Sequence, residues 1–241
     1  IITQPCPVIV SYCELHKHDL LPYLSPVHSP MACTAVYMRN AGVTGNIASI
    51  SPCIAKSKEH LSTGFIQYNI TFKRLYQYIE ENGIVLPEAR GGFDHYDAGP
   101  GMLFPLPGGL RENLEFFTGK TLHVEEAEGA GVFKYLEQYA ATEAKLLPDV
   151  FDVLSCADGC LIGSAALNRN NIFALNKRMQ QVRTLTDTNI EHSRERLAEY
   201  DRQLNLNDFL RSYQKTPPKY SNVAEAEIDR AFDAMQKYDY S

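Results

Sequence analysis

The chain is predicted to belong to the α/β class, and three observations lead to this prediction. Short apolar segments are followed by a turn and then by an amphipathic segment, the succession from which α/β units are built. Apolar residues make up 44% of the chain and charged residues 22%, the balance of a globular domain rather than a disordered one. Its 241 residues can bury a substantial core, in one large domain or in two lobes.

The first part of the chain predicts a helix and then two strands. Residues 8–24 are expected to form the start of a helix that carries Val8, Cys13 and Leu20 inward. Residues 46–51 form a short buried strand that a proline stops, so that Cys53 lies just past its C-terminal end. Residues 65–70 are a second strand candidate, and Thr71 caps a helix that carries an apolar stripe.

The second part of the chain begins with a loop over residues 87–109 that is rich in Gly and Pro. After it we expect a helix at 110–117, a strand at 122–125, a helix at 132–139 and a strand at 151–155. This last strand delivers Cys156 at its C-terminal end. From about residue 170 the chain becomes polar and helical, and Asn222 caps a final helix with Glu225 three residues on.

Charge and hydropathy exclude several classes of function. The net charge of -6 argues against a broad nucleic-acid surface. No apolar run approaches the length needed to span a membrane, and residues 1–5 lack the features of a signal peptide. We therefore expect a cytoplasmic protein. Because the chain starts without Met, we also expect it to be a piece of a longer protein.

The six cysteines of the chain do not have the density of a secreted disulfide scaffold. We interpret Cys13 and Cys33 as reduced, partly buried thiols. The remaining cysteines are the candidate metal ligands of the chain: Cys6, Cys53, Cys156 and Cys160.

The surroundings of these four cysteines favour an iron–sulfur cluster. Prolines stiffen the loops that hold Cys6 and Cys53. Cys156 and Cys160 form a Cys-x3-Cys pair, in which Gly159 lets the backbone pass close to an inorganic core. A helix beginning near Gly159 would direct backbone N–H groups toward an anionic cluster. Four cysteines also suit structural zinc, although ligands on three distant segments fit a zinc ribbon poorly.

Two further side chains, Lys56 and Glu59, belong either to the metal site or to the ordinary solvated surface. Lys56 lies one helical turn past Cys53 and would place a cation beside an anionic cofactor, or it is a solvated lysine. Glu59 is either its partner or a surface carboxylate. The spacing of the histidines does not indicate a set of metal ligands. His95 lies in the long loop and is the histidine that we consider as a candidate to approach the cleft.

Three segments of the chain resemble the signatures of the [FeFe]-hydrogenase active-site domain. They are Thr3–Pro7, Ser51–Glu59 and Leu154–Ser164. The resemblance implies two α/β lobes with parallel sheets flanked by helices, a cofactor in the cleft between them, and a first lobe that upstream sequence completes. Residues 1–165 would form the iron–sulfur core, and residues 166–241 a helical extension that packs on it.

The resemblance also implies roles for individual residues. Cys6, Cys53 and Cys156 would ligate a [4Fe-4S] cluster, and Cys160 would bridge to a diiron subsite with CO and cyanide ligands. Lys56 would hydrogen-bond a cyanide of that subsite. The remaining residues implied at the cofactor are Ser51, Pro52, Gly108, Gly109 and Gly159.

The chain departs from the family pattern at the proton path. A cysteine that relays protons in the prototypical enzymes is replaced by Pro5, which carries no exchangeable proton. Ser25 matches a serine of the usual path, and Ser51 and Leu154 replace methionines that pack on the cluster. These departures resemble the sensory branch of the family, where ferredoxin-like electron-transfer clusters and signalling modules such as PAS domains flank this domain.

Three functional hypotheses follow. The first is a hydrogen or redox sensor with slow hydrogenase turnover between H2 and protons. The second is a cluster-only scaffold or assembly-type protein that holds a [4Fe-4S] cluster without catalysis. The third is an interaction domain that is free of metal or binds zinc.

Overall fold

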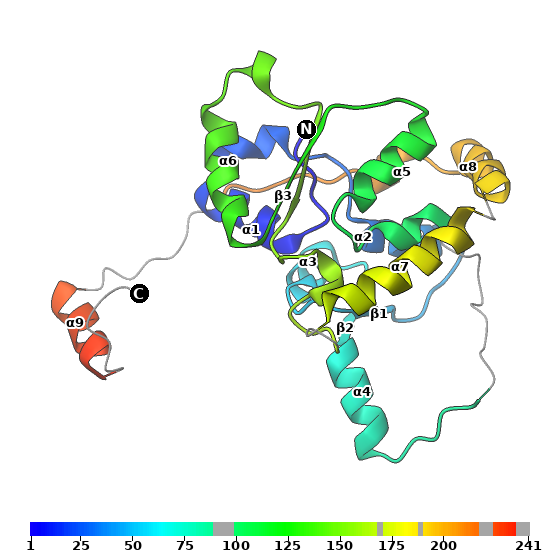
Figure 1. Ribbon diagram of the computed structural model, residues 1–241, viewed down its shortest axis with the longest axis horizontal. Coiled ribbons are helices and arrows are strands. Elements are labelled where there is room, and N and C mark those ends of the chain that lie inside the picture. The colour runs from blue at the N-terminus through cyan, green and yellow to red at the C-terminus, as the bar shows by residue number, and fades with distance from the viewer. Residues whose placement is uncertain (89–98, 168–170, 188–189, 217–223, 235–241) are drawn as a thin grey trace.

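The computed structural model describes residues 1–88, 99–167, 171–187, 190–216 and 224–234. Within them lie two parallel sheets of two strands each, flanked by helices (Figure 1). One sheet pairs β1 (Ala48–Ser51) with β2 (Tyr68–Thr71), and the other pairs β3 (Val124–Glu128) with β4 (Val150–Leu154). The predicted α/β class is confirmed.

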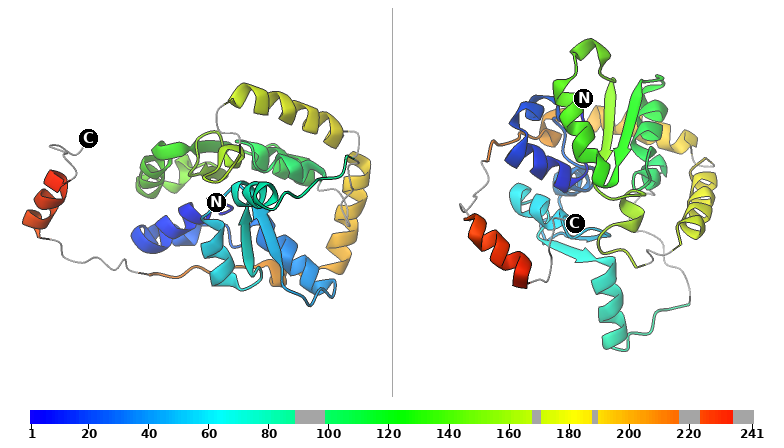
Figure 2. Two further views of the ribbon diagram at one scale, coloured as in Figure 1. Left: turned by 90° about the horizontal axis from the view of Figure 1, so that it is seen from below. Right: turned by 60° about the vertical axis from the view of Figure 1, so that its left-hand side comes forward.

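The first sheet carries three helices, α2 (Pro30–Asn40), α3 (Lys56–Thr63) and α4 (Phe72–Glu81). As predicted, Thr71 caps α4, since its hydroxyl accepts a hydrogen bond from the Arg74 N–H at 3.2 Å. No residue of α4 is buried, and the helix projects away from the rest of the structure in Figures 1 and 2. Helix α2 was not predicted, although Ser29 caps it before a proline at its first turn.

The second sheet is extended by the first residues of the chain. Ile2 forms parallel bridges with both Phe151 of β4 and Leu24, so it lies between them. The Thr3 N–H donates to the Phe151 carbonyl at 2.9 Å, and the Ser25 N–H donates to the Ile2 carbonyl at 2.8 Å. All five residues of β4 are buried, as expected for a strand with neighbours on both sides.

Two helices lie on opposite sides of this second sheet, α5 (Gly109–Thr118) and α6 (Val132–Ala141) (Figure 2). Both match predicted helices, and both strands overlap the predicted segments within a few residues. The main apolar core joins this sheet to α1 (Pro7–His16) and α6. Its fully enclosed side chains include Ile2, Ile9, Leu20, Val132, Leu136 and Val153.

The helix expected over 8–24 is shorter than predicted. Helix α1 ends at His16, Lys17 leaves the helical region, and residues His18–Tyr23 form a 3-10 helix. Pro22 lies inside this second segment. A proline lacks the N–H of an α-helical bond and its ring crowds the carbonyl four residues earlier, so a continuous α-helix cannot pass through it.

The C-terminal part contains α7 (Ile172–Asp187), α8 (Ile190–Gln203) and α9 (Glu225–Ala234). Residues 204–216, which we call the C-terminal strap, return along the first part of the chain. The His28 N–H donates to the Phe209 carbonyl at 2.9 Å, and the Arg211 N–H donates to the Pro26 carbonyl at 2.7 Å. The strap ends beside α1, where the Thr216 N–H donates to the Glu14 carbonyl at 2.9 Å.

Two sequence predictions cannot be compared with the structure, since Asn222 and His95 lie outside the described residues. Among the helices of the described ranges, none combines the length and the apolar character that crossing a bilayer requires.

The core predicts a clear difference between two leucines. Leu136 is 0% exposed and Leu61 is 87% exposed. We expect Leu136→Ala to lower the free energy of unfolding by about 2–5 kcal/mol, because it removes buried methyl groups and leaves a cavity. Leu61→Ala should change it by less than about 0.5 kcal/mol. Denaturant unfolding of both variants measures this, and equal losses would contradict the assignment of the core.

Candidate metal centre

The four candidate ligands come from separate elements that converge. Cys6 is the N-cap of α1, Cys53 lies in the turn between β1 and α3, and Cys156 follows β4. Cys160 begins a short 3-10 helix, Cys160–Ile162. Cys6, Cys53 and Cys156 all lie near enough to Cys160 to raise the pKa of its thiol, so the structure places the four cysteines in one region.

Backbone pairing explains why Cys6 and Cys156 meet. Residues 1–3 run parallel to β4, and the Thr3 hydroxyl donates to Oδ1 of the buried Asp152 at 3.0 Å. The same hydroxyl accepts a hydrogen bond from the Val153 N–H at 3.0 Å. Because parallel strands end at one edge of a sheet, the residues that follow each of them lie close together.

The turn that carries Cys53 is held by two polar side chains. Ser51, which is 1% exposed, accepts a hydrogen bond from the Cys53 N–H at 3.3 Å and donates to Asn69 Oδ1 at 2.8 Å. Asn69 Nδ2 in turn donates to the Cys53 carbonyl at 2.9 Å. The predicted contact of Ser51 with a cofactor remains a prediction, and Asn69 has no sequence pattern that identifies it.

The segment around Cys160 is tied to the Cys53 turn. The Ala165 N–H donates to the Pro52 carbonyl at 2.8 Å, and the Ile54 N–H donates to the Ser164 hydroxyl at 3.1 Å. The Cys160 N–H donates to the Pro105 carbonyl at 2.9 Å. Pro52 therefore lies at the junction of the two segments that carry these cysteines.

The helix expected near Gly159 is absent from the described residues at that position. A 3-10 helix of three residues follows Gly159 instead, too short to present the N-terminus of an α-helix to a cluster. Gly159 has φ 73° and ψ -163°, a region reserved for glycine. A Cβ there would lie 2.6 Å from the Pro105 carbonyl oxygen, so the glycine permits close packing on this neighbouring loop.

Lys56, the first residue of α3, lies beside the cysteines. Its Nζ donates to the Pro5 carbonyl at 2.9 Å and to the Ser29 hydroxyl at 3.2 Å, and it forms an ion pair with Glu59 Oε2 at 2.7 Å. Its side chain is 11% exposed. Lys56 is thus a buried, paired cation rather than a solvated one, and its charge acts on Cys160.

The donor set fits an iron–sulfur cluster. Burial is the largest cause that raises the pKa of the Cys160 thiol to about 12; the neighbouring cysteines also raise it and Lys56 lowers it. A bound metal ion would favour the thiolate form of this cysteine. Across the described part of the chain, no three His, Cys, Asp or Glu side chains are grouped to hold one metal ion. In a four-iron cluster each thiolate binds a different iron, which requires a wider set of sulfurs than a single zinc ion does.

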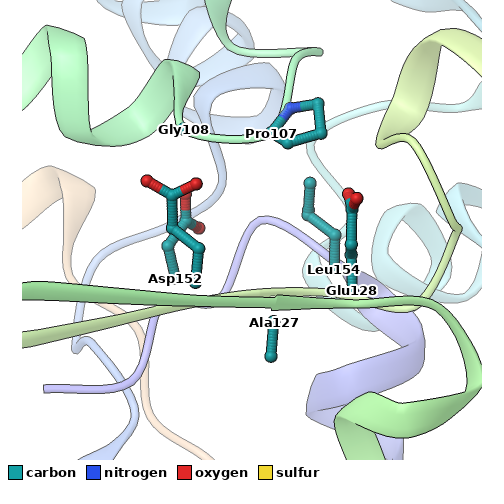
Figure 3. A pocket seen from close by; sticks show the side chains of 7 residues that line it. Pro107, Gly108, Ala127, Glu128, Asp152 and Leu154 are labelled. Carbon is teal, nitrogen blue, oxygen red and sulfur yellow. The ribbon is translucent and has the colours of Figure 1, made fainter.

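A separate acidic cavity of about 120 Å³ lies between the second sheet and the turn at Pro107 and Gly108. Figure 3 shows Asp152, Glu128 and Leu154 pointing toward this turn. Gly108 has φ 72° and is the N-cap of α5, and a Cβ on Gly109 would overlap the Leu103 carbonyl. These two glycines shape the turn, and their predicted contact with a cofactor remains a prediction.

Ser25 is held by backbone contacts at the edge of the second sheet. Its N–H donates to the Ile2 carbonyl at 2.8 Å, and its carbonyl accepts a hydrogen bond from the Tyr213 hydroxyl at 2.5 Å. The structure thus connects Ser25 to the C-terminal strap. Its predicted part in a proton path remains a prediction.

Gly159 predicts a graded effect of adding a methyl group. Gly159→Ala should cost about 2–5 kcal/mol of unfolding free energy, because φ is positive and the Pro105 carbonyl cannot move cheaply. Gly119 also has a positive φ, of 65°, but nothing lies within 4 Å of its added Cβ. Gly119→Ala should therefore cost about 1 kcal/mol. Denaturant unfolding compares them, and equal costs would argue against the close packing.

Asp152 predicts a pH dependence of stability. Burial, the largest cause, raises the pKa of this carboxyl from 3.8 to about 6. The folded state therefore binds the proton more tightly than the unfolded state, and stability falls as the pH rises from about 4 to about 6. Asp152→Asn should remove this fall and gain on the order of 2 kcal/mol at neutral pH. The exposed Asp201→Asn is the control in unfolding measured against pH, and an unchanged profile in Asp152→Asn would contradict the prediction.

Comparison with known proteins agrees with this geometry. The profile of the family "Iron only hydrogenase large subunit, C-terminal domain" matches residues 1–164. No curated protein matches the chain significantly.

Several solved structures share the fold. One, from work on oxygen inactivation of an [FeFe]-hydrogenase through its H-cluster 2Fe subcluster, is 19% identical with a TM-score of 0.64. The match covers 90% of this chain and 76% of the other. A variant of HydA1 from Chlamydomonas reinhardtii is 18% identical with a TM-score of 0.54, over 96% of this chain and 71% of that one.

A third similar structure is HydA(deltaEFG), described for stepwise H-cluster assembly, which is 19% identical with a TM-score of 0.54. That match covers 97% of this chain and 71% of the other. These likenesses show a shared fold, and the profile match over residues 1–164 shows the family. The chain belongs to the iron-only hydrogenase family, as a member of the group defined by the C-terminal domain of the large subunit.

Proposed function

We propose that this domain binds a [4Fe-4S] cluster and a diiron subsite, and acts as a hydrogen or redox sensor with slow hydrogenase turnover. The observation that carries the proposal is the convergence of Cys6, Cys53 and Cys156 on Cys160, with the buried Lys56 beside them. Family membership and the presence of four cysteines in one region both support a cluster over a single zinc ion.

Each residue of the site has a proposed task. Cys6, Cys53 and Cys156 would hold the cubane, and Cys160 would bridge to the diiron subsite. Lys56 would place a positive charge beside a cyanide ligand. It would also donate one N–H to that ligand after giving up one of its hydrogen bonds to the protein. When bound, this cofactor would supply electron storage and the splitting of H2.

Proton supply is the step that we expect to be slow. Pro5 has no side-chain proton, and its carbonyl is an acceptor already used by Lys56 at 2.9 Å. A slow exchange of protons suits a sensor, which must report occupancy rather than sustain flux. The proposed partners are H2 and protons, ferredoxin-like electron-transfer clusters, and a signalling module such as a PAS domain in a longer cytoplasmic chain.

A cluster-only scaffold or assembly-type protein is the second candidate, and one observation favours it. An ammonium group has three N–H donors. Those of Lys56 are matched by three protein acceptors, on Pro5, Ser29 and Glu59. Binding a cyanide would require Lys56 to give up one of these hydrogen bonds, whereas a lone cubane would not.

The ligand assignment predicts different outcomes for two cysteines. Cys53→Ala should reduce bound iron and acid-labile sulfide at least several-fold, since a cubane ligand is lost. Cys33→Ala should retain both iron and sulfide. The Cys33 thiol donates to the His28 carbonyl at 3.3 Å and is not among the candidate ligands. Iron and sulfide analysis of anaerobically matured protein checks this. Equal retention in the two variants would exclude Cys53 as a ligand.

Infrared spectroscopy separates the two candidate functions. Protein matured anaerobically with the hydrogenase maturation machinery should show CO and cyanide stretching bands if the diiron subsite is assembled. A cubane without these bands would overturn the sensor proposal and leave the cluster-only scaffold.

A further inference from the structure

We infer that Arg211, on the C-terminal strap, is a positioning residue for the metal centre, which acts by neutralising Glu59 and so leaves the charge of Lys56 available to an anionic cluster. This inference rests on the proposed function, because it concerns the charge that surrounds that cofactor. Neither the sequence signatures nor the family profile, which ends at residue 164, includes Arg211.

Glu59 lies between two cations in the interior. Its carboxylate is 1% exposed, and its two oxygens contact different partners. Oε2 lies 2.7 Å from Lys56 Nζ, and Oε1 lies 3.4 Å from an Arg211 guanidinium nitrogen. The Arg211 side chain is 10% exposed, so all three charged groups are largely removed from water. Charges in such surroundings interact strongly.

The three charges sum to one excess positive charge. Lys56 and Glu59 alone would form a neutral pair, and the cluster would face a dipole rather than a cation. Arg211 supplies a second positive charge, so Glu59 is paired with two cations. A cubane with four thiolates is anionic, so an excess positive charge next to it favours its reduced, more negative form.

The other titratable groups near Glu59 are uncharged at neutral pH, so they do not change the net charge of Lys56, Glu59 and Arg211. Burial lowers the pKa of both His28 and His60, which keeps them neutral. Burial raises the pKa of the Cys33 thiol to about 11 and also raises that of the Tyr213 hydroxyl. The charge balance of this interior region therefore depends on Lys56, Glu59 and Arg211.

The fold holds Arg211 in place from a distant part of the chain. Its N–H donates to the Pro26 carbonyl at 2.7 Å, and its guanidinium lies 5.1 Å from the centre of the Tyr213 ring. The Tyr213 hydroxyl donates to the Ser25 carbonyl at 2.5 Å. The strap thus delivers a cation to α3 across 152 positions of sequence.

The test is the midpoint potential of the cubane, by anaerobic redox titration of the whole chain. Arg211→Met should shift the potential to more negative values, because Lys56 is then neutralised by Glu59. Lys215→Gln removes the same charge from an exposed position of the same strap and should leave the potential unchanged. Arg211→Lys, which keeps the charge, should restore most of the shift.

A double variant distinguishes charge from structural damage. Glu59→Gln alone should shift the potential to more positive values. Combined with Arg211→Met it leaves Lys56 as the single charge of the three, so the potential should return toward that of the wild type. The charge account therefore predicts opposite shifts in the two single variants and cancellation in the double variant, a sign pattern that loss of stability alone does not produce.

The possible failures are separable. A wild-type chain that takes up no cluster overturns the proposed function and this inference together. Normal cluster uptake with equal potentials in Arg211→Met, Lys215→Gln and the wild type overturns this inference alone. A double variant with a potential as negative as that of Arg211→Met also overturns it.

Discussion

The candidate metal centre depends on parallel backbone pairing between the start of the chain and β4. Residues 1–3 lie between β4 and Leu24, and Thr3 fixes the register through Asp152 and Val153. This pairing brings Cys6 to the edge of the sheet where Cys156 emerges. The hydrogen bond from the Ala165 N–H to the Pro52 carbonyl then joins the Cys160 segment to the turn that holds Cys53. Four thiols from distant segments are thereby presented by main-chain contacts, which tolerate many changes of side chain.

Once the thiols are gathered, the electrostatics around them must suit an anionic group. Burial and the neighbouring cysteines raise the pKa of the Cys160 thiol. Lys56 opposes this with a buried positive charge, and Glu59 and Arg211 determine how much of that charge remains. Pro5 takes part in this arrangement through its backbone, since its carbonyl serves as an acceptor for Lys56.

Local patterns predicted much of the fold, including both strands that end near Cys53 and Cys156 and the cap of α4 at Thr71. The four candidate cysteines were singled out by their proline and glycine neighbours and by the strand ends before Cys53 and Cys156, and the family resemblance added their roles. Two predictions failed for local reasons: Pro22 interrupts the helix expected to 24, and the packing of Gly159 on Pro105 replaces a helix with a short 3-10 turn. Asn69 and Arg211 could not be predicted, because their contacts depend on tertiary packing across β2 and the C-terminal strap.

The central claim is that Cys6, Cys53, Cys156 and Cys160 together hold an iron–sulfur cluster. Anomalous X-ray diffraction from anaerobic crystals, recorded at the iron and zinc absorption edges, tests it most directly. The account predicts strong iron scattering enclosed by the four sulfur atoms, with any further iron next to Cys160 marking a diiron subsite. Zinc scattering at this place, or disulfides between these cysteines in protein that was never exposed to oxygen, would contradict it.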